Sequence, residues 1–108
     1  MFIENQDQIL RIINQVFELE KKSTQKTEMN SIQRNLTRIK DAFSEMGLQW
    51  SNPLGEPYND TRTDCEASIA GDSSENLKIT EVIKPIVWRK DGSLNYIVQK
   101  GLVIAESK

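Results

Sequence analysis

The strongest nucleophile in the sequence is Cys65, the only cysteine of the chain. A cysteine attacks as the thiolate, and a neighbouring base or cation must lower its pKa for it to do so. The sequence contains no histidine, which excludes a Cys-His pair, a Ser-His-Asp triad and a His-ligated zinc site. Cys65 shares the inward phase of a predicted strand with Ala67 and Ile69, so we interpret it as a buried structural thiol.

Four acidic residues lie close together in the sequence and are the next candidates, either as a metal site or as paired catalytic carboxylates. They are Asp60, Asp64, Glu66 and Asp72. Their spacing matches neither a calcium-binding loop nor the carboxylate pair of a glycosidase, so we interpret them as solvated side chains of turns and of a strand. The sequence also lacks a glycine-rich phosphate loop. We expect no metal site, no cofactor and no catalytic activity.

A short aromatic and basic stretch, Trp88-Arg89-Lys90, is the best candidate for binding a partner. Tryptophan and arginine dominate the energetics of protein interfaces. Strand alternation places Arg89 on the face opposite to Trp88 and Lys90. We therefore predict that Trp88 and Lys90 make the main contacts. Arg89 and Lys100 are weaker candidates, and a core tryptophan with solvated neighbours is the alternative.

The charge and hydropathy of the chain exclude several classes of protein. The 108 residues include 14 basic and 16 acidic side chains, so nothing favours binding to nucleic acid. No apolar run approaches the ~18 residues that span a bilayer, and the first residues do not resemble a secretion signal. We expect a cytoplasmic protein. Only 37% of the residues are hydrophobic, which suggests that a partner or a second copy contributes to burial.

The first half of the chain has the hydrophobic period of helices. Apolar residues at alternating steps of three and four form a heptad seam, which predicts a helix over residues 28–46 with Thr27 as N-cap and Gly47 as C-cap. The seam consists of Met29, Ile32, Leu36, Ile39, Phe43 and Met46. A wider apolar face over residues 9–19 predicts an earlier helix, joined to the later one around residues 22–26.

Two amphipathic helices cannot bury both of their apolar faces alone. We therefore expect residues 5–47 to form a dimerisation region, in which the helix pairs of two chains make a four-helix bundle through the seam. The protein would then be a homodimer. Packing of the seam within one chain is the alternative.

The second half, residues 48–108, has the pattern of a small antiparallel β domain. Residues 51–60 include two prolines and predict a loop. Strands are predicted at 65–70, at 77–83 with a bulge near Val82, and at 102–105. Asp91-Gly92 predicts a type I′ hairpin turn in which both residues have positive φ. The predicted fold class is α+β, a helix pair followed by a sheet of about four antiparallel strands.

The order of these parts resembles the C-terminal two-thirds of GrpE, the nucleotide exchange factor of DnaK-type chaperones. The resemblance covers residues 9–106. The matching stretches are the glycine-terminated helix end at 43–47, Gly-Glu-Pro-Tyr-Asn-Asp at 55–60, Cys-Glu-Ala at 65–67, Ile-Thr-Glu-Val-Ile at 79–83 and Leu-Val-Ile-Ala at 102–105.

This resemblance implies a dimer formed through the helices, with the β domain projecting as a wing. By resemblance, the wing contacts the ATPase domain of a DnaK-type chaperone, holds its nucleotide cleft open and releases ADP. The chain departs from the family pattern at Cys65, where histidine is usual, at Pro85 and at Gln99. These departures support the alternative, a structural or adaptor protein that keeps the fold and binds another partner.

Overall fold

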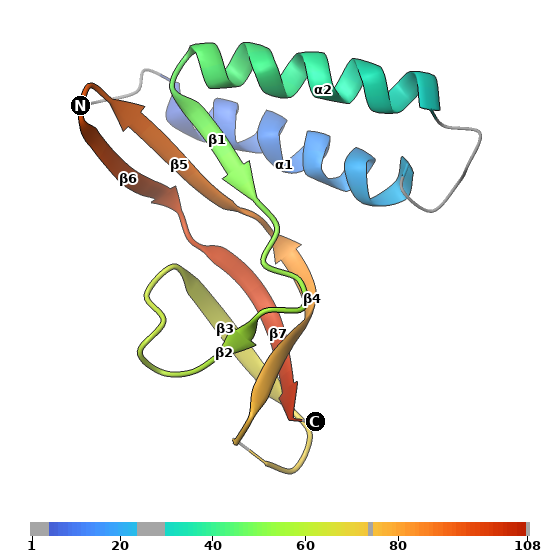
Figure 1. Cartoon of the computed structure of the whole chain (residues 1–108), viewed down its shortest axis with the longest axis vertical. Coiled ribbons are helices and arrows are strands. Elements are labelled where there is room, and N and C mark those ends of the chain that lie inside the picture. The colour runs from blue at the N-terminus through green and yellow to red at the C-terminus, as the bar shows by residue number, and fades with distance from the viewer. Residues whose placement is uncertain (1–4, 24–29, 74, 108) are drawn as a thin grey trace.

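Two helices and two sheets make up the part of the chain that the computed structural model describes, residues 5–23, 30–73 and 75–107. Helices α1 (Gln6–Ser23) and α2 (Asn30–Glu45) precede all the strands (Figure 1). Sheet 1 has the order β1-β5-β6, and sheet 2 has the order β2-β4-β7-β3. The strands are β1 (Leu48–Ser51), β2 (Pro57–Tyr58), β3 (Cys65–Ala70), β4 (Leu77–Lys84), β5 (Ile86–Asp91), β6 (Leu94–Gln99) and β7 (Gly101–Ser107). The predicted α+β class, with helices before strands, is confirmed.

The helix pair covers one face of sheet 1, with α1 and α2 antiparallel (Figure 1). The inward side chains follow the three- and four-residue steps of one helix face. Buried on this side are Ile13, Val16, Phe17 and Leu36 of the helices, and Leu48 and Trp50 of β1. They belong to one core cluster with buried residues of both sheets. Sheet 1 therefore covers the inward faces of both helices. The four-helix bundle expected from the sequence did not include a sheet.

Helix α2 agrees with the predicted helix within the described residues and ends at Glu45. Thr27 and Met29, the predicted N-cap and first seam residue, lie outside the described residues. Gly47 has a φ of +86°, and its N–H donates to the carbonyl of Ser44 at 2.9 Å. The predicted glycine C-cap is therefore confirmed. Neither described helix combines the length and the apolar character needed to cross a membrane.

The β half differs from the single antiparallel sheet that was predicted. Residues 48–51 and 57–58 form β1 and β2, where the sequence predicted no strand. β7 lies between β4 and β3, and it runs parallel to β3. A parallel pair joins segments that are distant in the sequence, and the alternation within each strand carries no information about such pairing.

Two strands of the β half agree with their predictions. β3 spans residues 65–70, as predicted. β4 contains register shifts between Ile79 and Glu81 and between Val82 and Lys84, which confirms the irregularity predicted near Val82. Such shifts bend a strand and increase its twist.

The hairpin between β5 and β6 is shifted by one residue from its predicted position. Asp91 pairs with Leu94, so the two-residue loop is Gly92-Ser93. Gly92 has a φ of +63°, whereas Asp91 is not among the described residues with positive φ. The prediction of a type I′ turn with two positive-φ residues is therefore wrong. A glycine at the first loop position is typical of a type II′ turn, which serves a hairpin equally well.

The chain passes between the two sheets at residues 52–56, at Pro85 and at Lys100, and the last two crossings lie together (Figure 1). We call this junction, formed by Pro85, Gln99 and Lys100, the elbow. The Nε2 of Gln99 donates to the carbonyl of Pro85 at 3.0 Å. The side-chain amides of Gln99 and Asn14 exchange two hydrogen bonds, at 2.9 and 3.2 Å. Gln99 therefore connects the two crossings and attaches them to α1.

Candidate functional site

The register of sheet 1 separates the predicted binding residues onto two faces. Leu48 lies opposite Arg89 and Trp50 lies opposite Val87, so these four residues share the face that the helices cover. Residues that alternate with them point to the other side. We call that side the outer face of sheet 1.

Trp88 and Lys90 lie on the outer face of sheet 1, as strand alternation predicts. Trp88 is half-buried beside Gln49 and Ile97, its neighbours on the adjoining strands, and Lys90 is exposed. The backbone of Lys90 is fixed, because its N–H donates to the carbonyl of Gly47 at 2.7 Å. A half-buried indole on a rigid strand fits the anchor of an interface.

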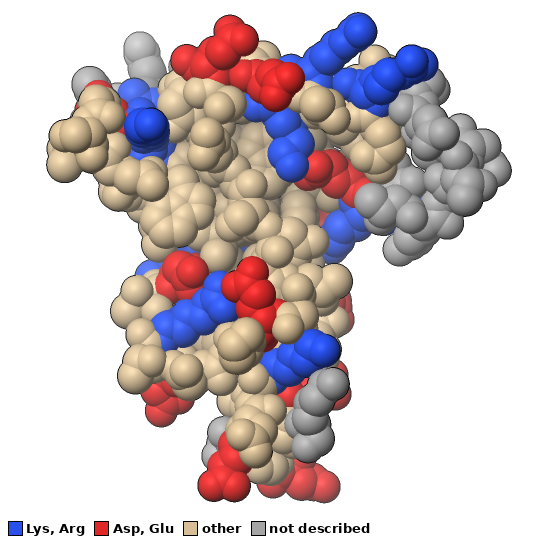
Figure 2. Space-filling model, in the orientation of Figure 1, with Lys and Arg blue, Asp and Glu red and all other residues tan. Residues whose placement is uncertain are grey.

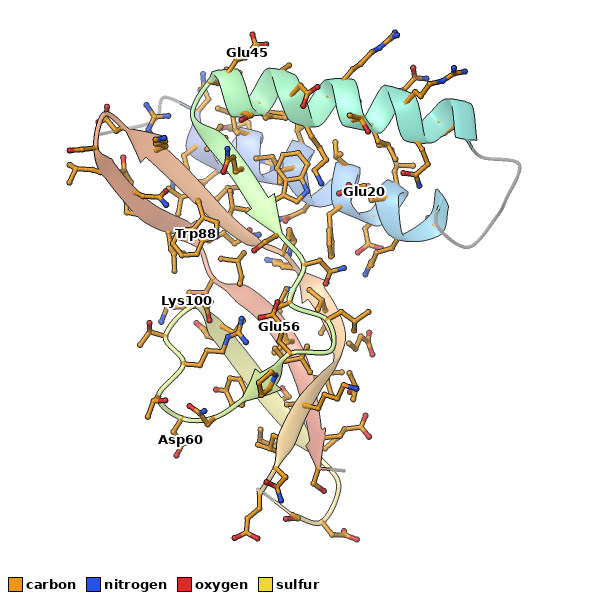
Figure 3. All side chains as sticks on the ribbon, viewed as in Figure 1. Glu20, Glu45, Glu56, Asp60, Trp88 and Lys100 are labelled. Carbon is orange, nitrogen blue, oxygen red and sulfur yellow. The ribbon has the colours of Figure 1, made fainter. Side chains whose placement is uncertain are left out.

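The core tryptophan of this chain is Trp50. Its indole Nε1–H donates to the carboxylate of Glu20 at 3.0 Å, and the ring of Phe43 packs edge-on against it at 5.6 Å between centroids. Lys40 donates to the other oxygen of Glu20, also at 3.0 Å, and its ammonium lies 5.6 Å from the Trp50 ring centroid. Figure 3 shows Glu20 between α1 and β1. These contacts, which the sequence analysis missed, attach both helices to sheet 1.

Arg89 lies on the covered face and does not join Trp88 and Lys90. It is half-buried opposite Leu48 and Tyr96, and its Nε atom is buried without a hydrogen-bond partner among the described residues. Its guanidinium is therefore directed toward the helix layer, away from the outer face. This placement argues against Arg89 as a contact of the same partner.

Lys100 lies at the elbow and is exposed. Figure 3 shows it on the same side of the molecule as Trp88, where sheet 1 gives way to sheet 2. It borders a shallow hollow of about 250 Å³ together with Lys84 and Glu66. A partner that contacts Trp88 and extends toward sheet 2 would reach this lysine.

The predicted dimerisation seam divides between the inside and the outside of the chain. Leu36 is buried, and Ile32 and Phe43 are half-buried against the core of the same chain. Ile39 and Met46 are 38% and 55% exposed. Helix α1 also exposes two large apolar side chains, seven residues apart, from the wide apolar face that the sequence predicted over residues 9–19: Ile12 and Leu19, at 53% and 51%.

These four exposed residues, Ile12, Leu19, Ile39 and Met46, form what we call the outer helix face. At about 100° of rotation per residue, Ile12 and Leu19 lie on one side of α1, next to the buried Val16. Ile39 lies on α2, and Met46 lies in the turn directly after its last residue, Glu45. The seven-residue spacing of Ile12 and Leu19 on α1 is the spacing of a helix-packing seam.

The acidic residues of the β half are held in place or solvated. Arg62 donates to Asp64 at 2.6 Å and to Glu56 at 2.7 Å, and its bond to Asp64 holds the pKa of that carboxyl below its usual range. Asp60, Glu66 and Asp72 are exposed. Within the described residues, no group of three or more metal-binding side chains converges.

Cys65 is buried, and this burial raises the pKa of its thiol. A raised pKa disfavours the thiolate that a nucleophile needs. The geometry therefore agrees with the interpretation of Cys65 as a structural residue.

No protein-family model, no curated protein and no solved structure matches this chain. Its function is therefore inferred from the residues and the geometry described above.

Proposed function

We propose that this chain is a GrpE-like co-chaperone, which binds the ATPase domain of a DnaK-type chaperone through the outer face of sheet 1 and promotes release of ADP. The observation that carries the proposal is Trp88. It is a half-buried tryptophan on a sheet face that neither of the two described helices covers, with the exposed Lys90 on the same strand. The exposed Lys100 extends this surface toward sheet 2.

The positions of the matching motifs support the proposal. The glycine-terminated helix end leads directly from α2 into β1. The other motifs fall on the segment that contains β2, on β3, on β4 and on β7, so all four contribute to sheet 2. Sheet 2 projects from the helix layer beyond the elbow (Figure 1). This is the arrangement expected of a wing.

The second part of the proposal is a homodimer formed through the outer helix face. Four large apolar side chains, three on the antiparallel helix pair and one in the turn directly after α2, would be buried if the same face of a second copy packed against them. Two such pairs make a four-helix bundle. The dimer differs from the one expected from sequence, because Leu36 and Phe43 serve the core of their own chain and Ile12 and Leu19 replace them at the interface.

Exchange activity in this proposal is differential binding, and no bond is made or broken. A wing that binds the open form of a nucleotide cleft more tightly than the closed form shifts the population toward the open form. A ~100-fold preference corresponds to about 2.7 kcal/mol, which lies in the usual range of coupling free energies.

A second candidate is an adaptor with the same fold and a different partner, and the elbow favours it. The three departures from the GrpE pattern gather there. Pro85 and Gln99 are bonded to each other, and Cys65 is buried within contact distance of Gly101, the residue after Lys100. Because the elbow sets the direction in which sheet 2 projects, changed residues there suit a changed partner.

The test is the affinity of the chain for an isolated DnaK-type ATPase domain, measured by calorimetry. We expect Trp88→Ala/Lys90→Ala to weaken binding about 30-fold or more, the usual loss for an interface anchor. The matched control is Lys22→Ala/Leu54→Ala, which removes one exposed basic and one exposed apolar side chain elsewhere. Equal affinities of the two variants would remove the outer face of sheet 1 from the proposal. Absence of binding by the parent chain would favour the adaptor.

A further inference from the structure

Strand β3 forms one edge of sheet 2, and its backbone groups on the free side can be identified. The N–H of Gly101 donates to the carbonyl of Asp64 at 2.9 Å, and the parallel register continues regularly from Cys65 opposite Gly101 to Ala70 opposite Glu106. In a parallel ladder, alternate residues direct both N–H and C=O to the neighbouring strand. Glu66, Ser68 and Ala70 therefore bond to β7. Cys65, Ala67 and Ile69 direct their N–H and C=O groups away from it.

Nothing among the described residues pairs with this edge. Sheet 2 ends at β3, and none of the backbone hydrogen bonds of turns and loops reaches Ala67 or Ile69. Ala67 is half-buried and Ile69 is 46% exposed, so neither residue is fully enclosed by the rest of the chain. An added strand would therefore find four free backbone groups in the middle of this edge.

The other sheet edges carry features that discourage such pairing. β1 has four residues, and β2 has two, one of which is Pro57. The pairing of β6 with β5 has a register shift at Val87 and Trp88. Short strands, proline and bulges are the usual means by which proteins block edges. β3 has six residues in regular register, with no proline, no lysine and no bulge.

The side chains of β3 define what the added strand must resemble. Ala67 and Ile69 share a face with Val103 and Ala105, their partners on β7, which are fully buried. Glu66 and Ser68, on the opposite face, are exposed. A strand bound here would extend both faces, so its residues should alternate between apolar and polar.

The charges at the two ends of the edge differ in sign. The exposed Lys84 and Lys100 border the hollow at the beginning of β3. Glu106, opposite Ala70, and Asp72 are exposed at its end, and Figure 2 shows acidic side chains at this far end of sheet 2. Complementarity therefore favours a strand with an acidic residue near the two lysines and a basic residue near the acidic end.

We propose that the free edge of β3 binds an extended segment of a partner polypeptide by strand addition. The segment has alternating apolar and polar residues and is acidic at the end that meets Lys84 and Lys100. Backbone hydrogen bonds to Ala67 and Ile69 supply the affinity, and the side chains beside Ile69 supply the selectivity. A single edge of six residues is too small for a stable interface between two folded chains, which favours an extended segment over a second copy.

Hydrogen exchange of the full chain, followed by NMR, tests the geometry first. The amides of Ala67 and Ile69 should exchange rapidly, whereas those of Ser68 and Ala70 should be protected by their bonds to β7. Protection of all four amides in the dilute chain would overturn the proposal, because the edge would then be occupied.

Selection from a library of displayed random peptides, each about ten residues long, tests the binding. Enriched peptides should alternate apolar and polar residues and carry an acidic end, and a synthetic copy should slow exchange at Ala67 and Ile69 about tenfold or more. Absence of enrichment, or enriched peptides that leave both amides unprotected, would contradict the proposal. Protection that rises with protein concentration without peptide would assign the edge to a second copy instead.

Two variants verify the site. Ala67→Pro removes an N–H that does not bond to β7, and proline is tolerated at sheet edges, so we expect a folded chain with about tenfold weaker peptide binding. Ile69→Lys places a charge on the edge and should weaken binding similarly. Its matched control is Ile83→Lys, because Ile83 is also an exposed isoleucine of sheet 2, at 43%. Unchanged affinity in Ile69→Lys would overturn the proposal, even if Ala67→Pro fails to fold. The proposal does not depend on exchange activity.

Discussion

The two tryptophans of the chain differ in burial: Trp50 is buried under the helices, and Trp88 is half-buried on the opposite face of sheet 1. Trp50 has an acceptor for its indole N–H in Glu20 and a cover of helices, so it can be buried without an unpaired donor. Trp88 lies between Val87 and Arg89, which are on the covered face, so it points to the uncovered side. Strand phase predicted the direction of Trp88 relative to Arg89. The acceptor for the Trp50 indole, Glu20, lies on helix α1, 30 residues earlier in the chain, and no local sequence pattern indicates it.

Position 47 requires glycine, because the backbone there has a positive φ and because β5 passes close to its Cα. We expect Gly47→Ala to lower the free energy of unfolding by more than ~2 kcal/mol. A φ of +86° costs an L-residue about 1–2 kcal/mol, and a Cβ would lie 2.6 Å from the backbone oxygen of Lys90. Urea unfolding measures the loss. The control is Gly55→Ala, with a φ of +85° but no atom nearer than 3.9 Å, which should cost only about 1–2 kcal/mol. Equal losses would contradict the close approach.

The ion pair of Arg62 and Asp64 predicts that the free energy of unfolding decreases at acidic pH. Hydrogen bonding to Arg62 lowers the pKa of Asp64 in the folded chain, so the unfolded chain binds more protons below a pH of about 4. The stabilisation is complete above the unfolded pKa and is lost as the pH falls toward the folded pKa. Asp64→Asn should lower stability at neutral pH and flatten the decline of stability as the pH falls below about 4.

Urea unfolding at a series of pH values measures this effect. Asp60→Asn is the control, because Asp60 is an exposed carboxylate of the same loop. If the free energy of unfolding falls as steeply with decreasing pH in Asp64→Asn as in the parent chain, other carboxylates cause the decrease, which would contradict this prediction.

At the scale of elements, patterns that a segment carries within itself were predictable. The end of α2, the bounds of β3 and the irregularity in β4 follow from glycine position and apolar period. β1 and β2 were missed because both are short and are stabilised by pairing with distant strands. The turn was displaced by one residue because Asp91-Gly92 and Gly92-Ser93 are both acceptable hairpin loops, and the register with β6 decides between them.

The outer helix face makes an element-scale prediction. We expect the parent chain to be dimeric at micromolar concentrations and Leu19→Glu/Ile39→Glu to be monomeric, because both carboxylates would be buried in the interface. Both residues are already exposed in a single chain, so the helical circular dichroism should be unchanged. Light scattering gives the mass.

Ile83→Glu is the control for this experiment, because it places a carboxylate at an exposed isoleucine of β4, away from the helices. It should remain dimeric. A monomeric parent chain, or a dimer that survives both helix substitutions, would contradict the bundle.

At the scale of the whole molecule, the elbow and the helix layer determine what the outer face of sheet 1 can contact. Gln99 bonds to Asn14 of α1 and to Pro85, so the direction of sheet 2 is tied to the helices. Residue types and alternation predicted Trp88 and Lys90 as surface residues. The position of Lys100 on the same side, and the separation of Arg89, depend on how the chain crosses between sheets, which only the assembled fold defines.

The rate of ADP release from a DnaK-type ATPase tests the central proposal most directly. A fluorescent ADP analogue is bound to the chaperone, and its release is followed by stopped flow with increasing amounts of the parent chain. The account predicts faster release that saturates as the chain reaches the concentration of the chaperone, and loss of the effect in Trp88→Ala/Lys90→Ala. A release rate that stays unchanged at a large excess of the parent chain would contradict it.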